Sequence, residues 1–143
     1  MPVSAAIAIA VAVLLLATVI GLVLRARDGR RRSGGGLAVR PEDLPAPLAD
    51  RATLVQFSTE LCARCPQVRR MLSSIADAVD GIAHVEVDLT HRQDLATRYH
   101  VLQTPTTFLV DASGTVISRW GGVPERAAVD GAIRAARTFQ EQS

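Results

Sequence analysis

The chain contains only two cysteines, and they lie where an apolar segment gives way to a helical pattern. Cys62 and Cys65 follow the mostly apolar residues 52–57 and precede apolar residues at helical spacing. A Cys-x-x-Cys pair at a strand-to-helix junction is typical of a redox site. Unpaired backbone N–H groups at the helix N-terminus favour the thiolate form of Cys62. Because one helical turn brings Cys65 close to it, the spacing predicts a dithiol that exchanges disulfides.

A metal site is the alternative for such a cysteine pair. A structural zinc needs four ligands, the chain has no other cysteine, and its three histidines show no paired ligand spacing. We therefore predict no metal within a single chain. A dithiol could still hold Cu(I) or zinc between two chains, so a metal carrier or a non-catalytic binding module stays open beside the redox enzyme.

The N-terminal segment predicts a membrane anchor. Residues 3–24 carry no charge and are long enough, at about 1.5 Å per residue, to cross a hydrocarbon core of about 30 Å. A cleaved signal peptide is the alternative, but no Arg or Lys precedes the segment and its apolar core is long for a signal peptide. We expect residues 1–24 to form one uncleaved transmembrane anchor in the cell membrane.

The residues after this segment predict its orientation. Five arginines fall within residues 25–32, where Asp28 is the only acidic residue. Basic residues beside a membrane span tend to stay in the cytoplasm, so we expect a cytoplasmic catalytic domain, with an extracytoplasmic domain as the alternative. The arginine run contains no aromatic residue and lies against the membrane, so it does not indicate a nucleic-acid partner.

The composition of residues 25–50 predicts a linker. Residues 25–50 combine the arginine-rich flank with a Gly-rich stretch and three prolines, which disfavour a regular helix. A short strand or turn near residues 37–39 is an open alternative. The folded domain is expected over residues 51–143, where ten arginines face ten acidic residues, so its charge balance points to no acidic or nucleic-acid partner.

The domain alternates strands with helices. Hydrophobic periodicity and turn residues predict strands and helices in the order βαβαββα. The expected strands are residues 52–57, 82–89, 106–110 and 115–120, and the expected helices are residues 62–79, 91–99 and a last one from Pro124. Right-handed crossovers then give an α/β fold, a central sheet with helices on both faces.

Three stretches together resemble the thioredoxin family. They are the strand and Cys-Ala-Arg-Cys site over residues 54–65, the second strand–helix unit over residues 87–99, and the proline loop, hairpin and glycine pair over residues 101–122. The resemblance covers the chain from about Ala52 to Phe139. It implies a thioredoxin-like fold, here a mixed four-stranded sheet preceded by one transmembrane helix. It also implies thiol–disulfide exchange with protein substrates and no cofactor.

The resemblance assigns Thr104 and Pro105 to the family's cis-proline loop. X–Pro is the peptide bond at which the cis form costs little. A cis turn would expose the backbone of Thr104 beside the cysteines, where it can pair with an extended substrate segment. We therefore expect Thr104 and Pro105 to bind substrate.

The residues around the cysteines depart from the family pattern. Leu61 and Ser58 stand where aromatic residues are usual, and Ala63 and Arg64 replace the usual Gly-Pro pair. The intervening pair tunes the reduction potential through the stability of the thiolate. We expect Arg64 to stabilise the thiolate and make the disulfide more oxidising than a Gly-Pro pair would. The alternative is a solvated Arg64 with little effect.

Two further departures concern the proton of the second cysteine. Gln56 replaces the buried aspartate that the family uses near Cys65, and glutamine cannot take a proton. Glu86 stands on the neighbouring strand where the family commonly has lysine. The hypothesis is that burial raises the pKa of Glu86, which then serves Cys65 as a base; the alternative is an exposed Glu86. The three histidines, His84, His91 and His100, are expected at the surface. Trp120 is expected to pack on the sheet, with a role as a substrate platform as the lesser alternative.

The mechanism predicted from these residues is disulfide reduction in cell redox homeostasis. The Cys62 thiolate attacks a substrate disulfide and Cys65 resolves the mixed disulfide. An electron donor, such as a thioredoxin reductase or a membrane redox partner, then restores the dithiol. A cytoplasmic domain favours this direction because that compartment keeps thiols reduced. If the domain lies outside, the same site would suit an oxidase, an isomerase or a cytochrome-maturation reductase.

Overall fold

A five-stranded mixed sheet forms the centre of the folded part of the chain. The computed structural model describes residues 2–142. The strand order is β1-β5-β4-β2-β3, in which β2 and β3 are parallel and the other neighbours are antiparallel. The strands are β1 (Arg31–Ser33), β2 (Ala52–Ser58), β3 (Ile82–Asp88), β4 (Thr106–Asp111) and β5 (Val116–Gly121).

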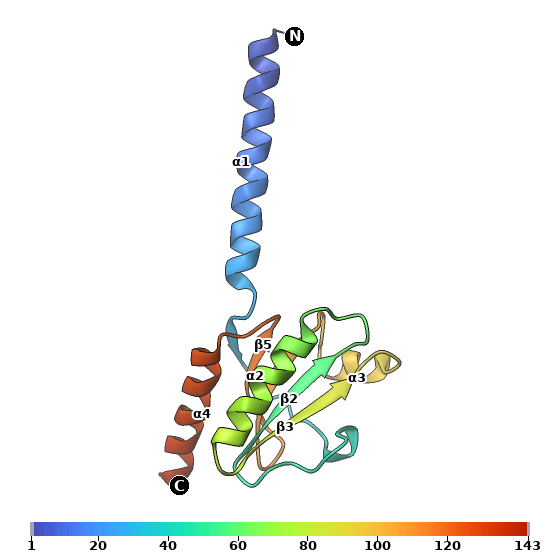
Figure 1. Cartoon of the computed structure of the whole chain (residues 1–143), viewed down its shortest axis with the longest axis vertical. Coiled ribbons are helices and arrows are strands. Elements are labelled where there is room, and N and C mark those ends of the chain that lie inside the picture. The colour runs from blue at the N-terminus through green and yellow to red at the C-terminus, as the bar shows by residue number, and fades with distance from the viewer. Residues whose placement is uncertain (1, 143) are drawn as a thin grey trace.

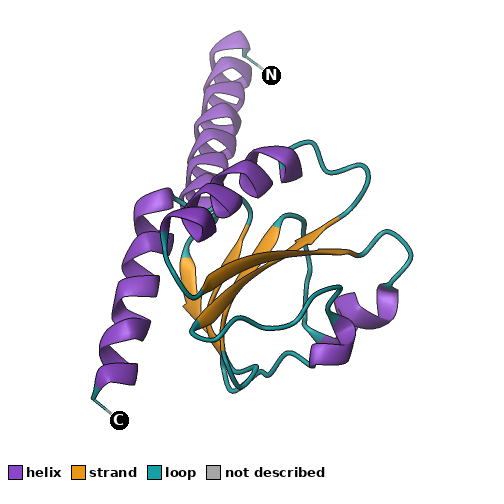
Figure 2. Ribbon diagram, turned by 60° about the horizontal axis from the view of Figure 1, so that its bottom comes forward, coloured by secondary structure: helices purple, strands orange, loops and turns teal. Residues whose placement is uncertain are grey.

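Helices cover both faces of this sheet, as predicted. On one face lie α2 (Cys65–Ala78) and α4 (Arg126–Glu141), and on the other lies the short α3 (Gln93–Arg98). Figure 2 shows the sheet between these two layers. The alternation along β2 explains the arrangement, because Leu54 belongs to the cluster under α2 and α4 whereas Val55 and Phe57 belong to the cluster under α3. The fold is therefore the thioredoxin-like α/β fold expected from the sequence.

The edge strand β1 was missed, because the sequence predicted four strands. Its residues, Arg31 to Ser33, are all exposed and show no apolar alternation that would indicate a strand. They pair with β5 through the register of Arg31 with Trp120 and Ser33 with Ser118. Backbone pairing at a sheet edge needs no apolar side chain, which is why the pattern gave no indication of it.

The segment predicted as a linker also packs on the sheet. Val39 is buried, Ala38 bridges Thr115, and a 3₁₀ turn η1 (Pro41–Asp43) follows. The side chains that pack against the α3-side cluster from this segment are Leu37, Leu44 and Leu48. These few apolar residues lie among Gly and Pro without periodicity, so their packing could not be inferred from the pattern. The open alternative of a short strand or turn near residues 37–39 describes this part better than a free linker.

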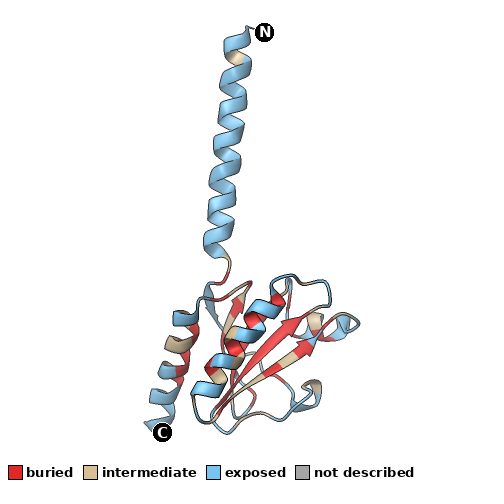
Figure 3. Cartoon of the chain, viewed as in Figure 1, coloured by how far each residue is buried: buried red, intermediate tan, exposed pale blue. Residues whose placement is uncertain are grey.

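A long helix α1 (Val3–Arg27) projects from the domain (Figure 1). It is long and apolar enough to cross a membrane, with a mean hydropathy of 3.1, and none of that apolar stretch is buried in the fold. Figure 3 shows its exposed surface along nearly its whole length. Its last turn carries Arg25 and Arg27, and the backbone N–H of Asp28 caps it by donating to the carbonyl of Leu24.

Candidate active site

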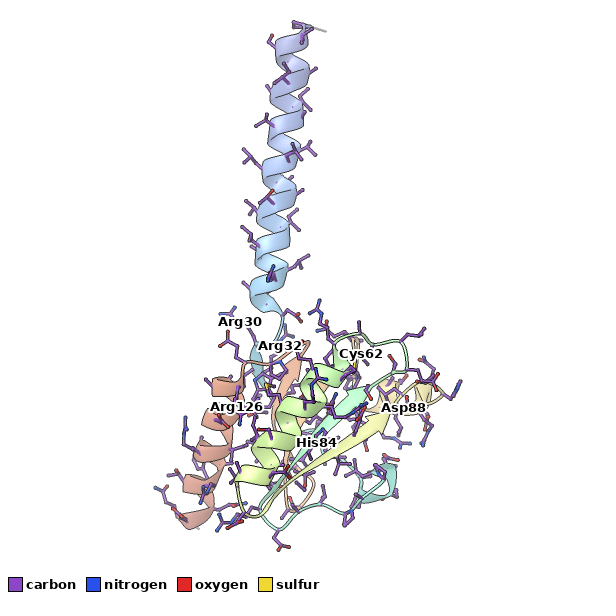
Figure 4. The ribbon with its side chains drawn as sticks, viewed as in Figure 1. Arg30, Arg32, Cys62, His84, Asp88 and Arg126 are labelled. Carbon is purple, nitrogen blue, oxygen red and sulfur yellow. A yellow bond between two sulfur atoms is a disulfide. The ribbon has the colours of Figure 1, made fainter. Side chains whose placement is uncertain are left out.

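The two cysteines lie between the end of β2 and the start of α2, and they are joined by a disulfide. Their Cα atoms are 5.4 Å apart, and the N–H of Cys65 donates to the carbonyl of Cys62 over 3.3 Å. The helix begins at Cys65 rather than at Cys62, with Pro66 in its first turn, where a missing N–H costs nothing. Cys65 is buried, at 2% exposure, whereas Cys62 is partly exposed. Cys62 is therefore the more accessible of the two cysteines, and it lies at the end of the domain next to α1 (Figure 4).

The proline loop lies against the cysteine loop. The peptide bond between Thr104 and Pro105 is cis. The hydroxyl oxygens of Thr104 and Thr59 are 3.3 Å apart, and the N–H of Gly122 donates to the carbonyl of Pro105 over 2.8 Å. A cleft of about 1310 Å³ brings together five of the residues expected at the site: Cys62, Ala63, Arg64, Thr104 and Pro105.

Gln56 lies fully buried beneath Cys65 and is held at both ends. Its Nε2 donates to the backbone carbonyl of Cys65 over 3.0 Å, and its Oε1 lies 3.0 Å from Nε2 of His84. Because Oε1 can only accept, the hydrogen of the His84 ring sits on Nε2, and Nδ1 then accepts from the hydroxyl of Ser73 over 3.0 Å. Gln56 thus fixes the backbone at the start of α2 and takes no part in proton transfer.

His84 does not lie on the surface, so that expectation was wrong. It is half-buried, and burial lowers its pKa, with a further lowering by Arg69 and an opposing attraction to Glu86. Periodicity along β3 could not locate it, because its partners Gln56 and Ser73 come from two other elements. His91 and His100 are exposed, as predicted.

Glu86 is an ionised partner of Arg69 rather than a base with a raised pKa. Its carboxylate pairs with the guanidinium of Arg69 through Nε and, at 2.6 Å, through Nη2, and it accepts from the hydroxyl of Ser58 over 2.6 Å. The hydrogen bond from Arg69 is the main cause that lowers the pKa of Glu86, and Ser58 adds to it against the effect of burial. The hypothesis of a raised pKa is therefore wrong. Arg69, one turn into α2 from Cys65, pairs with Glu86, and the sequence pattern gives no indication of this pairing.

Glu86 nevertheless lines a cleft together with both cysteines. A second cleft of about 400 Å³ has both cysteines, Glu86 and Arg69 in its lining. The ion pair therefore lies beside the buried Cys65 but faces solvent on its other side.

Arg64 lies between the cysteines and binds a partner that the sequence did not indicate. Its Nη1 donates to Oδ2 of Asp28, the residue that ends α1, over 2.9 Å. Asp28 in turn packs on Gly122. The sequence offered a cation beside the thiolate or a solvated side chain, whereas the structure pairs the charge of Arg64 with a carboxylate 36 residues earlier in the chain.

Two exposed leucines flank the site. Leu61, next to Cys62, is 97% exposed, and Leu102, next to Gln103 of the proline loop, is 96% exposed. Trp120, in contrast, is fully buried in the core cluster under α2 and α4, as predicted for a tryptophan packed on the sheet. Its burial is incompatible with the lesser alternative of a substrate platform.

The described part of the chain, residues 2–142, contains no group of three or more His, Cys, Asp or Glu side chains that could hold a metal ion.

Comparisons with known proteins agree with this architecture. A family model described as Thioredoxin matches residues 41–135. Thioredoxin of Gallus gallus is 28% identical over 91 residues, which cover 64% of this chain and 85% of that protein. A Schizosaccharomyces pombe protein described as a protein disulfide-isomerase is 36% identical over 76 residues, which cover 52% of this chain but 15% of that protein.

Solved structures support the fold. A mutant thioredoxin from Halobacterium salinarum superimposes with a TM-score of 0.55 at 23% identity, over 61% of this chain and 75% of that chain. Thioredoxin from Fasciola hepatica gives a TM-score of 0.54 at 19% identity, over 62% of this chain and 83% of that chain.

Proposed function

Because the chain belongs to the thioredoxin family, we propose that it is a membrane-anchored thiol–disulfide oxidoreductase that reduces protein disulfides with Cys62 and Cys65. The observation that carries this proposal is the cysteine pair itself, close enough to form a disulfide and opening on a cleft that it shares with Thr104 and Pro105. The difference in exposure between the cysteines supports Cys62 as the attacking thiolate and Cys65 as the resolving thiol.

The reaction transfers two electrons to the substrate. The Cys62 thiolate attacks one sulfur of the substrate disulfide, the substrate S–S bond breaks, and the other substrate sulfur leaves as a thiolate. Cys65 then attacks the sulfur of Cys62, which releases the second substrate sulfur and leaves the Cys62–Cys65 disulfide. The Cys65 proton passes to the substrate thiolate released in the first step, because Gln56 cannot take it and Glu86, whose pKa Arg69 lowers, is a weak base. A dithiol donor, such as a thioredoxin reductase or a membrane redox partner, restores the pair.

The substrate segment is proposed to bind in extended form along the proline loop. Thr104 supports this role, since it lines the same cleft as Cys62. Backbone pairing with an extended segment gives affinity without strong sequence preference, which suits a protein with several substrates.

The membrane arrangement is part of the proposal. We assign residues 1–24 as the anchor and residues 51–143 as the thioredoxin-like domain, with residues 25–50 between them, of which β1 and Val39 pack on the sheet of the domain. The length and apolar character of α1 support the anchor, and Arg25 and Arg27 in its last turn support a cytoplasmic domain. A cytoplasmic domain in turn favours the reducing direction, because thiols there are kept reduced.

Disulfide turnover by cysteine variants tests this function. The full chain, held in detergent micelles, is expected to accelerate the reduction of insulin by dithiothreitol, and Cys62→Ser is expected to abolish the acceleration. Cys65→Ser is expected to lose turnover as well but, in a single turnover with insulin in the absence of dithiothreitol, to accumulate a mixed disulfide on Cys62, visible by mass spectrometry. Turnover that survives in Cys62→Ser would contradict the proposal.

A further inference from the structure

The junction between α1 and the domain is held by several contacts. The N–H of Gly29 donates to the carbonyl of Gly121 over 2.6 Å, and the pairing of β1 with β5 begins at Arg31. Gly29 has a φ of 71°, and a Cβ there would overlap the carbonyl of Val123, so the chain passes very close to the domain at this point. Residues 28–30 are thus all that separates the last residue of α1 from the sheet. The domain is therefore docked on the end of the helix and does not hang from a free linker.

This junction lies directly beside the cysteines. Asp28 pairs with Arg64, which stands between Cys62 and Cys65. The large cleft at the site is lined from one side by the end of α1 and the residues just after it, namely Leu24, Arg25, Arg27, Asp28 and Arg32, and from the other side by the cysteine and proline loops. Figure 4 accordingly places Cys62 at the end of the domain nearest α1.

This geometry fixes the height of the site above a bilayer. If α1 spans the membrane, Leu24, the last residue of its uncharged stretch, ends the hydrocarbon region, and Arg25 and Arg27 lie among the lipid head groups. Asp28 follows only about 6 Å further along the axis at about 1.5 Å per residue. The cleft then opens at the membrane surface, and a bulky soluble protein would meet the bilayer before its disulfide reached Cys62.

The exposed leucines fit the same location. Leu61 and Leu102 stand at the cysteine and proline loops and are almost fully exposed. These two exposed side chains give a partly apolar partner segment a surface to pack against beside the cysteines. A chain segment that has just left the bilayer has this character, because apolar residues and aromatic anchors concentrate there.

We propose that the disulfide reduced by this site belongs to a membrane-embedded protein and lies in the segment next to one of its membrane spans. This inference rests on the proposed function and adds the class of substrate. The exchange stays balanced, because the chain's dithiol loses two electrons and two protons to become a disulfide while the partner's disulfide gains them to become two thiols.

A test with matched membrane peptides addresses this directly. The reduced full chain is placed in lipid nanodiscs, whose two faces are open to buffer, together with a synthetic single-span peptide that carries one disulfide. The disulfide lies about 3 residues from the span in one peptide and about 20 residues away, beyond a Gly/Ser spacer, in the other. Single-turnover transfer is followed by mass spectrometry. We expect the near peptide to react about tenfold faster, owing to its higher effective concentration at the cleft.

Two insertion variants separate position from chemistry. A Gly/Ser insertion of about 20 residues between Arg27 and Asp28 frees the domain from the bilayer and should reduce the preference to less than about twofold. The same insertion after the C-terminus should leave the preference intact. Equal rates with the two peptides for the unmodified chain, or a faster distant peptide, would overturn the inference. Insulin reduction in all three proteins shows that the proposed function stands, and its loss in all three would overturn that function instead.

Discussion

The amide of Gln56 donates a hydrogen bond to the backbone carbonyl of Cys65 over 3.0 Å, from a fully buried position. The other end of the same amide meets the ring of His84 at 3.0 Å. A residue that cannot carry a proton therefore occupies the place under the second cysteine, where it ties β2 and β3 to the first turn of α2. The contribution of Gln56 is the position of Cys65, and three of the predictions below concern the residues linked around it.

Replacing Gln56 with methionine should destabilise the fold. Gln56→Met keeps the side-chain length but leaves the Cys65 carbonyl and His84 Nε2 without their partner, which costs about 1–3 kcal/mol. The free energy of unfolding, measured by urea denaturation, tests this. Gln140→Met is the matched control, because Gln140 is exposed and also donates to a backbone carbonyl, that of Arg51 at 3.2 Å. Equal effects of the two substitutions would contradict the assigned role.

Stability should fall at mildly acidic pH because of His84. Burial holds the pKa of His84 below the ordinary histidine value of 6.5, so the unfolded chain binds the proton more readily than the folded one. The contribution is fully present above pH 6.5 and is lost as the pH falls below it, while Glu86 and Arg69 nearby keep their charges. The free energy of unfolding, measured from about pH 7.5 to about pH 5.5, checks this, because that range spans about one pH unit on each side of 6.5.

A histidine pair provides the control for that measurement. His84→Gln should flatten the pH dependence in this window, because the titrating group is gone. His100→Gln removes an exposed histidine and should leave the slope as it is. A slope that is unchanged in His84→Gln, or lost in His100→Gln, would show that another group causes the pH dependence.

Removing Arg69 should raise the pKa of Glu86. The hydrogen bond from Arg69 is the main cause of the lowered pKa, so Arg69→Ala leaves Glu86 with only the hydrogen bond from Ser58 and the attraction of His84 against partial burial. Carboxyl-carbon NMR titration should place the pKa of Glu86 below the ordinary glutamate value of 4.5 in the native chain and higher in the variant. Arg92→Ala, which breaks the exposed pair with Asp94, should leave Glu86 unchanged. A native pKa above 4.5 would restore the base hypothesis.

Gly122→Ala should disturb the contact between α1 and the active site. Gly122 has a φ of 83°, and a Cβ there would overlap the carboxylate of Asp28, which pairs with Arg64. Gly35 provides the control, since its φ of 62° is also positive but a Cβ there meets nothing within 4 Å. Both substitutions carry the backbone cost of about 1 kcal/mol for a left-handed residue. Gly122→Ala should cost up to about 1 kcal/mol more in urea denaturation, because the flexible carboxylate of Asp28 must move away from Arg64. Equal costs would contradict the close packing on Asp28.

The sequence was sufficient for the elements whose burial shows in a regular pattern. The strand–cysteine–helix unit, the parallel partner β3 and the hairpin of β4 and β5 follow from apolar periodicity and turn residues, with ends that differ by at most three residues. The Cys62–Cys65 spacing likewise located the centre of the site.

What the sequence did not indicate depends on pairings between distant residues. Strand β1 pairs by backbone alone, and Val39 packs on the sheet from a stretch rich in Gly and Pro. The partners Asp28 of Arg64 and Arg69 of Glu86 come from different elements, and nothing in the local pattern connects them. The predicted effects of the Arg64 charge and of Glu86 therefore left out Asp28 and Arg69, whose opposite charges offset them.

The reduction potential of the Cys62–Cys65 pair tests the central claim most directly. The full chain is equilibrated with glutathione buffers of known potential, and the fraction of intramolecular disulfide is measured by thiol labelling and mass spectrometry. We predict one two-electron transition at about −270 mV, which suits a reductase. A transition at about −120 mV would contradict the reducing direction. Absence of any intramolecular disulfide would contradict thiol–disulfide exchange as the function of this site.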